Sequence, residues 1–161
     1  MPFSLRRLSK VELEALAAER MPAGMGERAE PGSMPPAFVA ARSLRVGAEG
    51  HPEPWSAAYL IVKDEDETIV GGAAFKSAPT RGRVEVGYGV APGAQGRGAA
   101  TAALRQLLEV AFGAGAKEVL AEIVPTNHAS ARVVQKLGFV ASGSRVDDEG
   151  EQVVQWVRSK A

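Results

Sequence analysis

The strongest pattern in the chain is an apolar periodicity between residues 98 and 113, where small and aliphatic side chains recur at steps of three and four. Such spacing places them on one face of a helix, and Gly113 and Gly115 mark its end. The residues on this face are Ala100, Ala103, Leu104, Leu107, Leu108 and Ala111. The segment therefore predicts an amphipathic helix packed on a core.

Three further helices are predicted from start and stop signals. Ser9 and Glu12 have the spacing of a capping box, which predicts a helix to about Arg20 after a short strand over residues 3–8. Residues 21–36 are rich in Gly, Pro and Met, so we expect a loop there and a helical stretch over residues 37–46. Asn127 opens the last predicted helix, which stops at Gly138.

Strand-like runs fill the rest of the chain. Residues 57–63, 68–76 and 83–91 are separated by short turns and predict an antiparallel meander. Further strands are expected over residues 118–124, 139–146 and 152–158. A helical first third, a meander and then alternating strands and helices predict a mixed α/β (α+β) fold in a single domain over residues 1–161.

Composition narrows the classes of function. The 161 residues include 19 basic and 19 acidic side chains, which argues against binding to nucleic acid. No apolar run is long enough to cross a membrane, and the N-terminus does not resemble a secretory signal, so we expect a cytoplasmic protein. With no cysteine and two distant histidines, neither a thiol nucleophile nor a metal site is expected.

The chemistry is concentrated where the strand over residues 83–91 runs through a glycine-rich turn into the main helix. Unpaired N–H groups at a helix start, together with the helix dipole, favour an anion, and glycines let it approach closely. The alternative is an ordinary strand-to-helix turn that needs glycine for its geometry. The segment is Gln95-Gly96-Arg97-Gly98-Ala99-Ala100.

This turn resembles the Q/R-x-x-G-x-G/A signature of the GNAT superfamily of N-acetyltransferases. The segment from Asn127 to Phe139 is similar to the N-x-x-S-x-x-V-x-x-K-L-G-F pattern of the branch that contains the ribosomal-protein N-terminal acetyltransferases. The resemblance covers about residues 68–145. It implies an acyl-CoA N-acyltransferase fold, with a central, mostly antiparallel sheet flanked by helices, and acetyl-CoA as cosubstrate without a metal.

The resemblance also implies where acetyl-CoA binds. The strand containing Gly87 and Gly89 is expected to splay from its neighbour, with a bulge at these glycines and the pantetheine arm in the gap. Alternatively, the two glycines only relieve crowding in the sheet. The implied cofactor-binding residues are Val90, whose backbone would pair with pantetheine, Gln95, Gly96, Arg97, Gly98, Ala99, Ala100, Asn127 and Ser130.

Two catalytic residues are carried over with alternatives. Glu85 lies where many family members have a glutamate general base, and the alternative is a solvated or ion-paired strand glutamate. Glu122 is a second candidate for the base. Val134 stands where many members have a tyrosine acid, which leaves Ser130 as the candidate donor, unless it merely fills space beside a capping Asn127. Tyr88 is an alternative donor, but strand alternation puts it opposite Glu85, which favours core packing.

The acceptor is the least predictable feature. The resemblance implies a primary amine of a small molecule or of a protein N-terminus, and a monomer or a homodimer. Phe38, Trp55 and His51 are candidates for the acceptor side, with core packing or a solvated loop as alternatives, and the acids Glu27, Glu30, Glu49 and Glu53 are candidates for attracting a cation. Two other functions remain: a catalytically weak acyl-CoA sensor, suggested by Val134, and an anion-binding protein unrelated to CoA.

Overall fold

A seven-stranded sheet with the order β1-β2-β3-β4-β5-β7-β6 forms the centre of the protein. The structure, a computed structural model, describes residues 2–160. All neighbouring strands are antiparallel except β4 and β5, which confirms the predicted mixed, mostly antiparallel sheet. The elements are β1 (Phe3–Arg7), α1 (Lys10–Ala17), α2 (Ala37–Ala48), β2 (Ala58–Lys63), β3 (Ile69–Phe75), β4 (Arg83–Val90), the 3-10 turn η1 (Pro92–Ala94), α3 (Ala99–Gly113), β5 (Glu118–Ile123), α4 (His128–Lys136), β6 (Val140–Val146) and β7 (Gln152–Ser159). Within this described part, no helix is long and apolar enough to cross a membrane.

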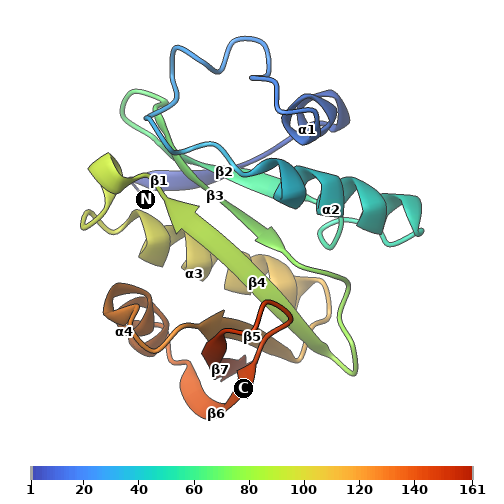
Figure 1. Cartoon of the computed structure of the whole chain (residues 1–161), viewed down its shortest axis with the longest axis vertical. Coiled ribbons are helices and arrows are strands. Elements are labelled where there is room, and N and C mark those ends of the chain that lie inside the picture. The colour runs from blue at the N-terminus through green and yellow to red at the C-terminus, as the bar shows by residue number, and fades with distance from the viewer. Residues whose placement is uncertain (1, 161) are drawn as a thin grey trace.

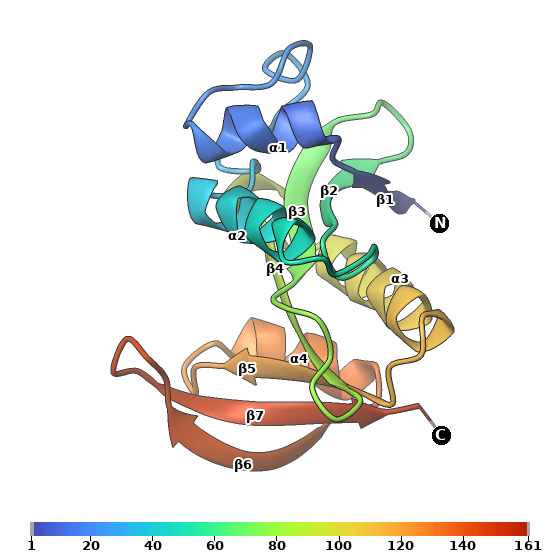
Figure 2. The same cartoon turned by 90° about the vertical axis from the view of Figure 1, so that its right-hand side faces the viewer.

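Helices cover both faces of the sheet (Figure 1, Figure 2). On one face, Leu13 and Leu16 of α1 are buried in the same cluster as Leu60 of β2. On the other face, Leu104 and Leu107 of α3 join a cluster with side chains of β4, β5 and α4. The predicted apolar face of α3 is the one that packs on the sheet.

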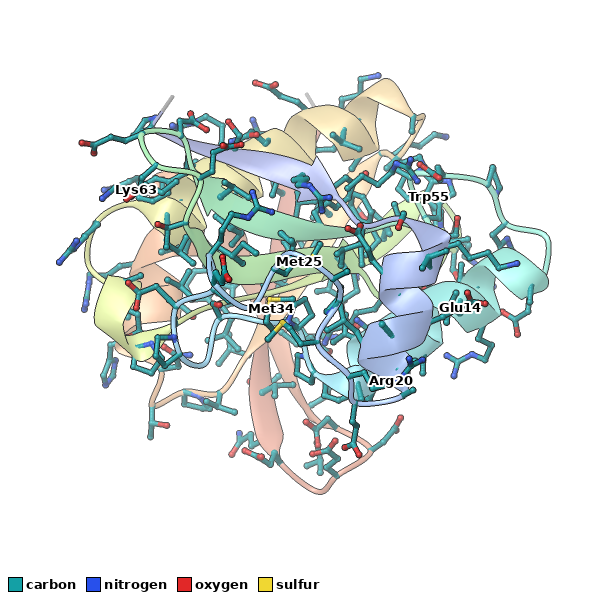
Figure 3. The ribbon with its side chains drawn as sticks, turned by 90° about the horizontal axis from the view of Figure 1, so that it is seen from above. Glu14, Arg20, Met25, Met34, Trp55 and Lys63 are labelled. Carbon is teal, nitrogen blue, oxygen red and sulfur yellow. The ribbon has the colours of Figure 1, made fainter. Side chains whose placement is uncertain are left out.

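Local signals explain where the first helices begin and end. Ser9 Oγ accepts from the Glu12 N–H, and the Glu12 carboxylate accepts from the Ser9 N–H, so the predicted capping box is present. The helix ends at Ala17, before the predicted Arg20, and Glu19 has a left-handed φ of 59° that a helix does not continue. The loop after it lies over the sheet, where Met25 and Met34 lie close together (Figure 3), and Met25 is buried.

Strand β4 is the element that joins the two halves of the sheet, and Figure 1 shows it running diagonally between them. The predicted bulge at Gly87 and Gly89 is wrong, because Val86 to Val90 pair in unbroken register with β3. The crowded glycine lies on the neighbouring strand instead. A Cβ at Gly71 would lie 2.1 Å from the carbonyl oxygen of Gly89, so the close approach of β3 to β4 requires a glycine at this position.

A buried carboxylate braces the β6–β7 hairpin against β5. Glu122 accepts hydrogen bonds from Arg145 Nε at 2.5 Å, Arg145 Nη2 at 2.8 Å and Gln155 Nε2 at 2.9 Å. Its side chain is only 6% exposed. The hydrogen bonds from Arg145, opposed by burial, lower the pKa of Glu122. The brace fixes Arg145 two residues before Asp147, where the hairpin turn begins.

We expect Gly71→Ala to destabilise the protein by at least about 2 kcal/mol, because the added methyl meets backbone and no side chain can move aside. The matched control is Gly113→Ala at the end of α3, where a Cβ meets nothing within 4 Å and alanine should change stability by less than about 1 kcal/mol. Urea unfolding of both variants measures the difference. Equal midpoints would contradict the packing argument.

Glu122→Gln should lower the free energy of unfolding by about 1 to 2 kcal/mol at neutral pH, because hydrogen bonds to a charged group are lost. The pKa of Glu122 is lower in the folded than in the unfolded chain, so the ionised group stabilises above the unfolded value and this contribution disappears as pH falls through the folded value. The difference in the free energy of unfolding between parent and variant should therefore become smaller from pH 7 to pH 4. Glu109→Gln, on the exposed side of α3, is the control. A difference in the free energy of unfolding that does not change with pH would show that ionised Glu122 does not stabilise the fold.

Candidate functional site

Strand β4 has a pairing partner on only one side over its second half. It pairs with β5 from Arg83 to Glu85 and then diverges, while β3 continues beside it to Val90. The N–H of Ala91 donates to Val70 and the carbonyl of Glu85 accepts from Lys76, both at 2.8 Å, so alternate residues of β4 bond to β3. The backbone of the residues between them, including Tyr88 and Val90, therefore faces the gap beside β5. The expected splay is present.

The turn after β4 presents a helix start to this gap. Gly96 and Gly98 have φ values of 80° and 88°, which favour glycine. Gly98 is the N-cap of α3 and makes no side-chain cap, and the first N–H of the helix with an intrahelical partner is that of Ala102. The N–H groups of residues 99–101 thus remain available at the positive end of the helix dipole.

A cavity of about 510 Å³ lies over this helix start, between β4, α3 and α4, and we call it the α3–α4 cavity. It brings together eight of the nine predicted cofactor-binding residues, which come from three separate segments. Arg97 is exposed and is not among the described residues that line it. The eight are Val90, Gln95, Gly96, Gly98, Ala99, Ala100, Asn127 and Ser130.

Two of these side chains also have a structural role. Gln95 Nε2 donates to the carbonyl of Val90 at 3.1 Å, which ties the turn to the end of β4. Asn127 Oδ1 accepts from the N–H of Ser130 at 3.1 Å and caps α4. The sequence analysis missed two cations on the cavity face of α4, Arg132 and Lys136. Their spacing of four residues, about one helical turn, was the available signal.

Tyr88 also lines the α3–α4 cavity, with its hydroxyl at the α4 side. Its ring packs against the main core, as its place in the strand predicts. Its hydroxyl, however, is buried without a hydrogen-bond partner among residues 2–160. Burial raises the pKa of Tyr88, and the neighbouring Ser130 hydroxyl opposes that shift. Val134, in place of the usual family tyrosine, is fully buried.

A second cavity, of about 740 Å³, lies on the opposite side of β4, and we call it the α2–hairpin cavity. It is lined by residues 32–36, by one face of α2, by β3 and β4, and by the turn between β6 and β7. The two cavities share Tyr88, Gly89 and Val90. They therefore meet at the half of β4 that β5 leaves unpaired.

Both candidate bases line the α2–hairpin cavity in ion pairs. Glu85 accepts from Lys76 Nζ at 2.8 Å, and Glu122 is bound by Arg145. The lowered pKa of Glu122 makes it a weaker base, so Glu85 is the better candidate. Burial lowers the pKa of Arg42, which faces the same cavity from α2, and the charge of Glu85 opposes that shift.

The structure separates the candidates for the acceptor side. Phe38 lines the α2–hairpin cavity, with the guanidinium of Arg42 6.0 Å from its ring centre. Trp55 is buried, and its ring packs edge-to-face with that of Phe75, with 5.1 Å between the ring centroids. It lies apart from Met34, which lines the cavity (Figure 3). His51 is exposed in a loop. The core-packing and solvated-loop alternatives therefore hold for Trp55 and His51.

The acids predicted to attract a cation lie elsewhere. Among the described residues that line the α2–hairpin cavity there is none of Glu27, Glu30, Glu49 and Glu53, and Glu53 instead pairs with Arg7 at 3.1 Å. The carboxylates of the hairpin turn, Asp147, Asp148 and Glu149, line the cavity in their place. Over the same described part of the chain, no three His, Asp or Glu side chains are grouped to hold a metal ion.

The fold matches ribosomal-protein-S5-alanine acetyltransferase from Vibrio fischeri at 16% identity, with a TM-score of 0.70 over 99% of this chain and 93% of that one. It also matches RimJ from Mycobacterium smegmatis in complex with CoA-disulfide (18% identity, TM-score 0.68, 98% and 82% covered). A third match is a phosphinothricin acetyltransferase from Sinorhizobium meliloti in complex with acetyl-CoA (19% identity, TM-score 0.68, 99% and 89% covered).

At the level of sequence, a search of curated proteins finds no match. The family model described as "Acetyltransferase (GNAT) domain" matches residues 3–140, which is most of the chain. The strands, the glycine turn and the start of α4 that build the α3–α4 cavity all lie inside this range. The chain belongs to the GNAT acetyltransferase family.

Proposed function

We propose that this protein transfers the acetyl group of acetyl-CoA to a primary amine, either of a small molecule or of a protein or peptide N-terminus. The observation that carries the proposal is the meeting of two cavities at Tyr88, Gly89 and Val90. The α3–α4 cavity has hydrogen-bond donors that suit a phosphorylated cofactor. The α2–hairpin cavity has carboxylates that suit an amine. Similar folds were determined with acetyl-CoA and with CoA-disulfide, which supports the choice of cofactor.

The α3–α4 cavity fits acetyl-CoA at three points. The open N–H groups at the start of α3 suit the pyrophosphate, and Arg132 and Lys136 lie where further phosphate charge needs a counterion. The backbone of Tyr88 and the N–H of Val90, which β5 leaves without a strand partner, suit the amides of pantetheine, which would extend β3 and β4 as an added strand does. Acetyl-CoA supplies an acyl group activated as a thioester, and the Val90 N–H is available to polarise its carbonyl.

The amine would enter through the α2–hairpin cavity. Five carboxylates and three cations line this cavity, so it favours a positively charged acceptor. Its volume of about 740 Å³ lies within the range of small-molecule sites, and the end of a peptide would also enter it. The similar folds include enzymes named for a ribosomal protein and for phosphinothricin, so both kinds of acceptor stay in the proposal.

An attacking amine must lose a proton, and Glu85 is our proposed base. Its Cα lies three residues before Tyr88, or about 10 Å along the strand, so Glu85 would act through water. Lys76 holds the carboxylate at the cavity wall. Holding both reactants at one point of β4 supplies the proximity that direct attack requires.

A catalytically weak acyl-CoA sensor is the second candidate function, because Val134 is buried and has no hydroxyl to protonate the leaving thiolate. Both functions require the cofactor, and only the first requires turnover. Calorimetric titration with acetyl-CoA, followed by an amine-panel assay of thiol release on the same sample, separates them.

In that titration we expect Gly98→Val to weaken acetyl-CoA binding at least about tenfold, because valine does not adopt the φ of 88° that aims the turn at the anion. The control is Gly113→Ala, at the other end of the same helix, which should bind as the parent does. Normal binding by a folded Gly98→Val protein would show that the turn does not hold the cofactor.

Glu85→Gln should lower turnover about 10²-fold below the pKa of the amine, where a base is needed, and less above it, while acetyl-CoA affinity is retained. Lys76→Met breaks the same ion pair but keeps the carboxylate, so it controls for the structural effect of the pair. Its activity at low pH should stay closer to that of the parent. A pH–rate profile of Glu85→Gln identical to the parent's would remove Glu85 as the base.

A further inference from the structure

Within residues 2–160, two side-chain polar atoms are buried without a hydrogen-bond partner, Ser33 Oγ and the Tyr88 hydroxyl, and of these Tyr88 lies where the two cavities meet. A buried hydroxyl without a partner costs stability, and nearly all such groups in folded proteins have one. Tyr88 as a residue lines both cavities. The Ser130 hydroxyl is near enough to oppose the rise in the pKa of Tyr88 that burial causes, but it does not meet hydrogen-bond geometry, so the missing partner is expected from a bound molecule.

The side chain and the backbone of Tyr88 lie in different surroundings because of its position in β4. Its side chain shares a face of the strand with Val84 and Val86 and joins the core beneath α3 and α4. Its backbone faces the gap left by β5. One residue thus presents a free N–H to the gap and a free hydroxyl beside Ser130 on α4, at the point where the two cavities meet.

Few other groups there are able to donate a proton. Val134 and Val133 on α4 have none, and the chain has no cysteine. Arg132 and Lys136 line the same cavity and carry the positive charge that suits phosphate. The hydroxyls of Ser130 and Thr101 remain, but an alcohol is a far weaker acid than a phenol. Burial, which raises the pKa of Tyr88, keeps the phenol protonated and ready to donate at neutral pH.

We propose that Tyr88 is the catalytic acid of this enzyme: its hydroxyl donates a hydrogen bond to the sulfur of CoA and protonates it as the thiolate leaves. The inference rests on the proposed acetyl transfer. Tyr88 on β4 thus takes the role of proton donor that the sequence analysis gave to Ser130 on α4, across the same cavity.

The proton balance closes without another reagent. The nitrogen of the neutral amine forms a bond to the carbonyl carbon, and the bond between that carbon and sulfur breaks. The Tyr88 hydroxyl gives its proton to the sulfur, and the proton that the nitrogen loses returns to the Tyr88 phenolate through water and the Ser130 hydroxyl. The products are an N-acetyl amide and the CoA thiol.

The test measures the thiol pKa of bound CoA by the ultraviolet absorbance of its thiolate. Because the chain has no cysteine, the thiolate signal comes from CoA alone, and a titration without CoA subtracts tyrosine ionisation. A hydrogen bond from Tyr88 stabilises the thiolate, so Tyr88→Phe should raise the thiol pKa by about one unit or more. Turnover should fall about 10²-fold, with nearly unchanged KM for acetyl-CoA.

The chain supplies a matched control, because it has only two tyrosines. Tyr59 lies on β2 and is not among the residues lining either cavity, so Tyr59→Phe should leave the thiol pKa unchanged. In that background Tyr88 is the only tyrosine, and its replacement by fluorotyrosine makes the phenol a stronger donor without removing it. The thiol pKa should then fall below the parent value. This second measurement keeps the test decisive if Tyr88→Phe folds poorly.

An unchanged thiol pKa in both Tyr88 variants that still bind CoA would overturn the role of Tyr88 and leave acetyl transfer standing. If the thiol pKa changed only in Ser130→Ala and not in the Tyr88 variants, Ser130 and not Tyr88 would be the proton donor. If the parent protein binds neither CoA nor acetyl-CoA, the proposed function and this inference fail together.

Discussion

The divergence of β5 from β4 is the constraint on which the rest of the structure depends. A strand in the middle of a sheet normally has partners on both sides, and unpaired backbone groups away from water are costly. Here β4 keeps β3 beside it to Val90 but loses β5 after Glu85. Those free groups are what a ligand with amide groups can satisfy, so the binding site is built into the pairing of the sheet.

Each half of the sheet on either side of the gap has stabilising contacts of its own in addition to the shared core. Strands β2 and β3 are fixed by the cluster beneath α1 and α2, and β5 to β7 by the hairpin and the Glu122–Arg145 brace. Helix α3 crosses behind both and contributes Leu104 and Leu107 to the main core. The close contact of Gly71 with Gly89 then holds β4 to β3. The two halves thus form the two walls of one site.

Sequence patterns predicted nearly all elements, because their signals are local. The capping box at Ser9, the cap at Asn127 and the periodicity of α3 each depend on residues within a few positions of one another. The bulge at Gly87 and Gly89 was wrong for the opposite reason. Which strand needs a glycine depends on the distance between backbones, and the crowded position proved to be Gly71, eighteen residues before Gly89.

The same distinction between local and long-range information applies to the site. The glycine turn was predictable because a helix start follows directly from the chain, whereas the acids of the α2–hairpin cavity come from a hairpin some sixty residues after Glu85. Strand alternation predicted that Tyr88 packs in the core, and this is correct for its ring. A phenol is long, however, so its buried hydroxyl extends beyond the ring's core contacts to the neighbourhood of Ser130 on α4. Alternation along a strand gives the direction of a side chain, but the position of its polar end depends also on its length and on the helix opposite.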